Sequence, residues 1–255
     1  MPIIIKKDFM FNFFNKKAAS KLFYNTDIHS HILPGVDHGS RDIATSIELL
    51  KDQIGIGISN FIFTSHVTET TFENTPESLK ASYDILTKAI KDEGLDIKTA
   101  FSAEYRLDEY SLGQFAENKI VPMPNDFILI ENSFQQELLG LDDILFDIQI
   151  KGFRPILAHP ERYNYYGYRH QRYKQLHDAG ILFQTNILSF AGYFGSQAYE
   201  NAKWLLEQDY IDFLGSDIHN KDYSNSIIDF LSTKEYRKIE AKLKDRILND
   251  TAFDF

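Results

Sequence analysis

The 255-residue sequence contains no cysteine. Disulfide bonds, thiolate metal ligands and mechanisms that need a cysteine nucleophile are therefore excluded. The absence is compatible with the cytoplasmic location that we expect. The chain also lacks a Pro-, Gly- or Ser-rich linker, a low-complexity tract and an internal repeat. We therefore expect one domain over residues 21–255, preceded by an N-terminal extension over residues 1–20.

Long apolar runs are missing as well. No stretch approaches the ~20 apolar residues that a membrane-spanning helix needs, so we expect no membrane span. In the N-terminal extension, Lys and Asp interrupt the apolar runs and no small-residue cleavage site follows, which argues against a signal peptide. The extension either packs or frays beside the domain, or forms an aromatic and basic patch that contacts a membrane surface or a partner.

Positive charge is scarce: 27 Lys and Arg residues face 37 Asp and Glu residues, which gives a formal net charge of -10. A groove for the backbone of nucleic acid favours a basic face, so we expect no nucleic-acid partner. A local cationic site is still permitted, because bound metal ions bring their own charge.

Short apolar runs alternate along the chain with helical patterns. The predicted strands cover residues 22–29, 60–64, 96–103, 127–130, 155–158, 181–185 and 210–215. The predicted helices cover residues 42–57 and 76–93, a segment capped by Ser133 with Gln136 that ends at Gly152, a segment through Leu176 that ends at Gly180, and residues 198–208 and 233–248. Continuous apolar strands separated by helices are typical of a parallel sheet covered on both faces.

Side chains capable of metal chemistry follow the predicted strands. They are His29, His31, His66, Glu104, Glu131, His159, Asp217 and His219. In a β/α barrel the strand ends converge on one mouth, where active sites lie, whereas an open sheet spreads them along an edge. We therefore expect an α/β fold with a closed or nearly closed barrel.

The stretch from residue 26 to residue 39 carries the densest signal. His29 and His31 lie two positions apart at a strand end, so their side chains share a face. Neutral imidazoles paired in this way are good ligands for Zn, Mn or Fe. Pro34 and Gly35 then turn the chain, so that His38 can approach the same place.

Five separated segments together resemble the polymerase and histidinol phosphatase (PHP) family, and within it the bacterial metal-dependent protein-tyrosine phosphatase branch found with capsule and exopolysaccharide biosynthesis. The segments are Asp-x-His-x-His-x-Leu-Pro-Gly-x-Asp over residues 27–37, the strand-end His66, the strand-end Glu104 and Glu131, Ala-His-Pro-Glu-Arg over residues 158–162, and Ser-Asp-Ile-His over residues 216–219. The resemblance extends from Asp27 to His219.

The resemblance implies a distorted TIM-like (β/α)7 barrel of PHP type that holds two or three divalent metal ions. By this resemblance, the first ion would be bound by His29, His31, Asp217 and a bridging Glu104. The second would be bound by His38, His66 and His219, and the third by Glu104, Glu131 and His159. The branch usually has Asp where this chain has His38, so the metal preference can shift. Asp27 is expected to orient a metal ligand through a hydrogen bond without binding the metal itself.

Ligands drawn only from nitrogen and oxygen suit Mn, Fe or Zn, and Mg less well. We expect Mn, with Fe or Zn as alternatives. The resemblance implies hydrolysis of phosphotyrosine by metal-activated hydroxide. The expected substrate is a phosphotyrosine protein such as a bacterial tyrosine kinase, and the expected role is regulation of exopolysaccharide or capsule synthesis.

Further candidates are assigned to the handling of phosphate and substrate. Arg162 could hold phosphate oxygens bidentately, and Arg106 is a second candidate for this role. His38 or a metal-bound water could act as the general acid. Tyr163 and Arg169, in the Tyr- and Arg-rich segment over residues 163–173, could contact the substrate together with Arg162. A plain surface loop is the other interpretation of that segment.

Three other functions stay open at this point. The first is a small-molecule phosphatase acting, for example, on histidinol phosphate, which would have a narrow mouth. The second is a nuclease or proofreading activity, which fits the acidic balance badly. The third is a non-catalytic metal-binding module that partners a kinase or export system, although its ligand set would be expected to show losses.

Overall fold

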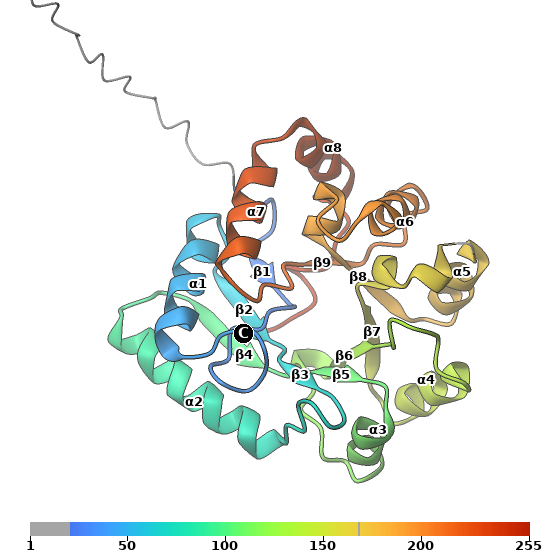
Figure 1. Ribbon diagram of the computed structural model, residues 1–255, viewed down its shortest axis with the longest axis horizontal. Coiled ribbons are helices and arrows are strands. Elements are labelled where there is room, and N and C mark those ends of the chain that lie inside the picture. The colour runs from blue at the N-terminus through green and yellow to red at the C-terminus, as the bar shows by residue number, and fades with distance from the viewer. Residues whose placement is uncertain (1–20, 168) are drawn as a thin grey trace, which may run out of the picture.

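The computed structural model describes residues 21–167 and 169–255, so the predicted extension over residues 1–20 lies outside the described residues. Parallel strands occupy the centre and helices surround them (Figure 1). The strands are β1 (Thr26–Asp27), β2 (Asn60–Phe63), β3 (His66–Val67), β4 (Lys98–Phe101), β5 (Glu104–Arg106), β6 (Phe127–Glu131), β7 (Arg154–Ala158), β8 (Leu182–Asn186) and β9 (Phe213–Gly215). The helices are α1 (Ile43–Gly55), α2 (Pro76–Asp92), α3 (Glu109–Ala116), α4 (Leu141–Ile150), α5 (His170–Asp178), α6 (Ser196–Glu207), α7 (Lys221–Leu231) and α8 (Lys234–Leu243).

Hydrogen bonds join two parallel sheets into one ring. The sheet orders are β1-β2-β4 and β3-β5-β6-β7-β8-β9. Because β2 leads into β3 and β4 leads into β5 after short breaks, the second sheet continues the first. The ring closes where the amide of Asp217 donates to the carbonyl of His29 (2.8 Å) and the amide of His31 donates to the carbonyl of Ile218 (3.0 Å). The predicted α/β fold with a parallel sheet is confirmed, and the two breaks account for its distortion.

The strands are buried on both faces, which explains their continuous apolar sequences. In β6, Phe127 and Leu129 point into the ring, where they pack with Ile62 and Phe213. Their neighbour Ile128 points outward into the core that the helices cover. Within the part of the chain that the structure describes, no helix has the length and apolar character needed to cross a membrane.

Local signals predicted several element ends well. The side chain of Asp42 accepts a hydrogen bond from the amide of Thr45 at the start of α1. Thr75 caps α2 in a reciprocal capping box, and Pro76 occupies its first turn. These caps satisfy amides that have no partner inside the helix.

Several predicted bounds were wrong. The strand predicted over residues 210–215 begins only at Phe213 as β9, and the helix predicted over residues 233–248 ends at Leu243 as α8. The first strand was predicted over residues 22–29, but it pairs as β1 only over Thr26–Asp27. The chain before it is held instead by the hydrogen bond that the Leu22 amide donates to the Ile56 carbonyl. The capping box at Ser133 does not form. Instead, α4 begins after Gly140, which has a left-handed backbone and no side-chain cap.

The C-terminal segment locks the first strand to the last. The side chain of Asn249 accepts from the amide of Leu214 (3.0 Å) and donates to the carbonyls of Leu214 (2.8 Å) and Thr26 (2.9 Å). Beyond it, Phe253 packs on Phe127 and Phe213. The lock therefore sits beneath the ring, at the end opposite the strand termini that carry the predicted ligands.

Replacing Asn249 with Ala should lower the free energy of unfolding by about 2 to 4 kcal/mol, because buried backbone groups of two strands lose their partner. Urea denaturation followed by circular dichroism would measure the change. Asp245→Ala, at an exposed position of the same segment, is the matched control and should have little effect. Equal stability of the two variants would contradict the conclusion that Asn249 stabilises the junction of β1 with β9.

Candidate metal centre

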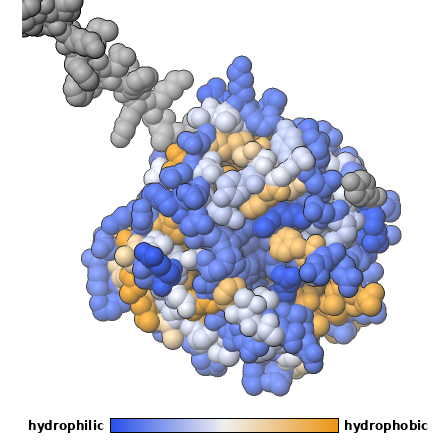
Figure 2. Space-filling model, viewed as in Figure 1, coloured by the Kyte–Doolittle hydropathy of each residue, from blue (hydrophilic) through white to orange (hydrophobic). Residues whose placement is uncertain are grey.

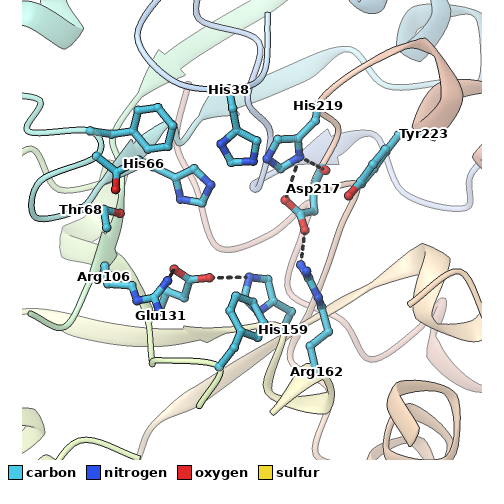
Figure 3. Close-up of a pocket in the computed structure, with 13 residues that line it drawn as sticks. His38, His66, Thr68, Arg106, Glu131, His159, Arg162, Asp217, His219 and Tyr223 are labelled. Carbon is cyan, nitrogen blue, oxygen red and sulfur yellow. Dashed lines mark hydrogen bonds and ion pairs between the residues drawn. The ribbon is translucent and has the colours of Figure 1, made fainter. Parts of the chain in front are cut away.

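The ends of the strands bring all nine predicted metal-ligand residues to one site. They are His29, His31, His38, His66, Glu104, Glu131, His159, Asp217 and His219. Figure 3 shows six of these side chains, all but the fully buried His29, His31 and Glu104, around a pocket that Arg106 and Arg162 enter on opposite sides of His159. On the whole molecule, the hollow at the centre of this face is mainly hydrophilic (Figure 2). The predicted convergence of strand-end residues is therefore observed.

Four donor atoms form a compact first group. Nε2 of His29 lies 3.2 Å from Nε2 of His31 and 3.4 Å from Oδ1 of Asp217. Nε2 of His31 lies 3.2 Å from the same oxygen of Asp217. Oε2 of Glu104 lies 3.4 Å from the His29 nitrogen and 3.6 Å from the His31 nitrogen. The donors of His29, His31 and Glu104 all lie within 4.8 Å of one another, and the Asp217 oxygen lies within 3.4 Å of both histidine nitrogens, so the four side chains can approach one metal ion.

Glu104 connects this group to the others. Its Oε2 also lies 2.9 Å from Nδ1 of His66, and its Oε1 lies 2.9 Å from Nε2 of His159. The same nitrogen of His159 is 3.6 Å from Oε1 of Glu131. One fully buried carboxylate thus reaches donors of all three predicted groups, as a bridging ligand must.

The second group differs from the prediction in one member. Donor atoms of His31, His66 and His219 lie within 4.8 Å of one another. His38 stacks on His66 with ring centroids 4.9 Å apart and lies 4.5 Å from the ring of His219. It is exposed and belongs to none of the donor groups found among the described residues. A ligand role for His38 stays a prediction.

The donor set fits divalent metal ions. Oε2 of Glu104, Nδ1 of His66 and Nε2 of His219 are buried and make no well-aligned hydrogen bond in the part of the chain that the structure describes, although the first two atoms lie 2.9 Å apart. Buried polar atoms are normally hydrogen-bonded, so these three atoms fit a role as metal ligands. All donors are nitrogen or oxygen, which Mn, Fe and Zn accept.

The electrostatics of the site point the same way. Burial lowers the pKa of His219 to about 3, with His31 adding to the effect, and burial with Arg162 lowers that of His159 to about 4. These imidazoles are neutral at pH 7, the form that binds metal. Burial also acts to lower the pKa of His29, but Glu104 and the nearby Asp217 raise it to about 9. The carboxylates therefore create a field that favours a cation at this point.

Three residues that sequence reasoning did not assign hold the ligands in place. Oε1 of Gln184 lies 2.6 Å from Nδ1 of His29, which leaves Nε2 facing the donor group. Gln184 donates to Asn186 (2.8 Å), and Asn186 donates to Oδ2 of Asp217 (2.8 Å). Polar side chains two apart in the buried strand β8 were the available signal.

Asp37 is the third of these residues. Its Oδ2 lies 2.8 Å from Nδ1 of His31 and accepts from the amide of His66 (3.1 Å), while Oδ1 accepts from the amide of Gly39 (2.9 Å). Asp27, which was predicted to orient a ligand, accepts from the amide of His29 (3.3 Å). The contact of Asp37 with the His31 ring fixes its orientation and raises its basicity, whereas Asp27 holds the backbone of His29.

The backbone is strained at two of the predicted ligands. His159 has φ of 32° and Asp217 has φ of 50°, in the left-handed region that residues other than glycine rarely adopt. His159 directly follows β7, and Asp217 follows β9 after one intervening residue. Strain of this kind persists where the surroundings enforce it, commonly at functional sites.

Arg106 and Arg162 both reach the pocket, whose volume is about 240 Å³. Arg162 donates to Oδ2 of Asp217 (2.9 Å), and Arg106 donates to Oε2 of Glu131 (3.2 Å). The side chain of each arginine makes this one hydrogen bond among the described residues, so its other N–H groups are available to a ligand. This is the placement expected of phosphate-binding arginines.

The substrate-binding prediction for Tyr163 was wrong. The side chain is fully buried, and its hydroxyl donates to the carbonyl of Ala158 (3.0 Å) and accepts from the amide of Asn132 (2.9 Å). Arg169 is exposed and does not line the pocket. Most tyrosines of the Tyr-rich segment are buried in the hydrophobic core. Tyr168 of this segment lies outside the described residues.

The aromatic side chains that do line the pocket are Phe72, Phe134 and Tyr223. They come from three separated segments, none of which is rich in aromatic residues near them. No local pattern in the sequence distinguishes them from other single aromatic residues.

Comparisons with known proteins agree with this site. A family model described as capsular polysaccharide synthesis, CpsB/CapC, matches residues 25–253. The tyrosine-protein phosphatase YwqE of Bacillus subtilis is 32% identical over 196 residues, which span 76% of this chain and 77% of that protein. The tyrosine-protein phosphatase CpsB of Streptococcus pneumoniae is 30% identical over 229 residues, which span 85% of this chain and 93% of that protein. A solved structure, from work on YwqE and CpsB as unique metal-dependent tyrosine phosphatases, matches with a TM-score of 0.74 at 26% identity and covers 90% of this chain and 95% of that chain.

Replacing Gln184 with Leu should weaken metal binding by about 10- to 100-fold, because Nδ1 of His29 loses the partner that orients its ring. Titration of the metal-free protein with Mn or Zn against a competing chelator would measure the affinity. Gln175→Leu, at an exposed position of α5, is the matched control. Identical affinities in the two variants would remove Gln184 from the support of the site.

Proposed function

Since the chain belongs to the CpsB/CapC family of capsular polysaccharide synthesis, we propose that it is a metal-dependent protein-tyrosine phosphatase, a phosphoric monoester hydrolase. The observation that carries the proposal is the juxtaposition of buried donor groups with two arginines in one pocket. The relatives named as tyrosine-protein phosphatases support the choice of substrate.

The proposed ligands of the metal ions are the donor groups described above. His29, His31, Asp217 and Glu104 would hold one ion, with His66 and His219 at a second and Glu131 and His159 at a third, and Glu104 between them. Divalent ions held at such a site lower the pKa of water and neutralise charge on phosphoryl oxygens. We propose Mn as the resident metal, with Fe or Zn as alternatives that the same donors accept.

Arg162 and Arg106 would bind the phosphate. Each is tied through one N–H group to a carboxylate of the site, so the guanidinium is fixed before the substrate arrives. Its remaining N–H groups can then hold phosphoryl oxygens at little cost in side-chain entropy. Positioning of this kind favours the transition state, in which charge on those oxygens is redistributed.

The leaving group eases the reaction. A tyrosyl oxygen has a pKa of ~10 and is expelled far more easily than a serine alkoxide. Burial and the neighbouring His66 lower the pKa of His38. Its imidazole is therefore neutral at pH 7, which favours a role as ligand or acceptor over that of general acid.

We further propose that the substrate protein is a tyrosine kinase of a capsule or exopolysaccharide system and that the reaction takes place in the cytoplasm. The family description, which places the chain in capsular polysaccharide synthesis, supports the biological setting.

The assay of first choice compares a phosphotyrosine peptide with histidinol phosphate, using purified protein whose metal content is measured on the same sample. Turnover of the peptide should disappear after chelation and return when Mn is added, because the metal ions that would activate water and neutralise phosphoryl charge are removed and then restored. Preference for histidinol phosphate would replace the proposed substrate class. Measured metal without turnover of either compound would contradict the phosphatase proposal.

Arg162→Ala should reduce kcat/KM for the phosphotyrosine peptide by about 100-fold, because a positioned donor to the phosphoryl group is lost. The metal content should stay close to that of the wild type, since Asn186 still holds Asp217. Arg237→Ala, at an exposed position of α8, is the control. Loss of metal in the Arg162 variant would show that this arginine serves the metal centre and not the substrate.

A further inference from the structure

Phe134 occupies a distinctive place in the pocket. Its ring lies between the two arginines, with Cζ of Arg162 4.9 Å and Cζ of Arg106 5.8 Å from its centroid. It also stacks on His159 at 5.6 Å with an interplanar angle of 20°. Yet 38% of this large apolar residue is exposed, at a pocket whose floor is made of charged and polar groups.

The segment that carries Phe134 is held from behind. The hydroxyl of Tyr165 donates to the carbonyl of Ser133 (2.9 Å), next to Phe134. Further along, Glu137 accepts from the hydroxyl of Tyr166 (2.5 Å) and from Arg172 (2.9 Å). The Tyr-rich segment thus fixes the strand-to-helix connection, so that Phe134 is presented to the pocket in one position.

The wall on the side of His38 and His66 is aromatic as well. Phe72 stacks on His66 at 5.8 Å and on His38 at 5.4 Å. Its position is fixed by the paired backbone of Thr68 and Phe72, whose amides each donate to the other's carbonyl. The pocket therefore combines a polar floor, which carries the candidate metal ligands and two arginines, with apolar aromatic walls.

We propose that Phe134 is a specificity-determining residue that packs against the aryl group of the substrate, so that the site selects aryl phosphates over alkyl phosphates. The inference rests on the proposed function. A phosphoryl group held by both arginines lies beside the ring that both arginines flank, so the group bonded to it lies within reach of Phe134. A phenyl ring gains contact area and a favourable ring–ring arrangement there, whereas an alkyl chain gains much less.

The test measures binding of two stable phosphonates to the metal-loaded protein by calorimetry: benzylphosphonate, which carries a phenyl ring, and propylphosphonate, which does not. The wild type should prefer benzylphosphonate. Phe134→Ala should weaken benzylphosphonate by about three- to tenfold, the range of an aromatic pair, and leave propylphosphonate within about twofold. Phe134→Tyr should restore the preference, and Phe134→Leu should restore it only in part.

Phe146→Ala is the matched control, because Phe146 is 60% exposed on α4 and does not line the pocket. Equal weakening of both phosphonates by Phe134→Ala, or no change in either, would overturn the inference, as would a wild type that binds neither. A wild type that shows the Phe134-dependent preference but hydrolyses no phosphotyrosine peptide would support the inference while refuting the proposed function. The two failures are therefore distinguishable.

Discussion

The burial of the Glu104 carboxylate is the constraint on which the rest of the structure depends. A carboxylate removed from water is costly unless opposite charge and hydrogen bonds compensate it. Here His29, His31, His66 and His159 all lie within 3.6 Å of its oxygens, contributed by three different strand ends. The ring of strands must close for these imidazoles to meet, so the fold and the candidate metal centre stabilise each other.

A second layer of polar contacts decides which atoms of the ligands face inward. From strand β8, Gln184 contacts the ring of His29 and Asn186 donates a hydrogen bond to Asp217. Asp37 contacts the ring of His31 in the same way. The arginines complete this layer on the open side, since each binds the carboxylate oxygen that lies away from the donor groups. The same arginines would meet the phosphate, which couples the geometry of the substrate site to that of the metal centre.

The sequence predicted the strands and the ligand residues because both leave local signals. Runs such as residues 127–130 are apolar on both faces, and all the predicted strands except the one over residues 181–185 lead to a residue capable of binding metal. It could not predict which aromatic residues reach the pocket. Tyr163 lies in a dense aromatic cluster but is turned into the core, whereas Phe134 stands alone in its segment and is turned out. That choice depends on the path of the chain between strand and helix, which no periodicity encodes.

The closure of the ring by β1 and β9 has a consequence for synthesis. Asp217, and with it the first donor group, comes from the last strand, and Asn249 fastens that strand to the first across 223 positions of the chain. Contacts of such long range form late and slowly, because the conformational entropy of closing the intervening loop is lost before the contacts stabilise the chain. A nascent chain on the ribosome therefore carries most of the ligands without the geometry to use them. The centre becomes able to hold metal ions tightly only after β9 and Asn249 have joined the ring.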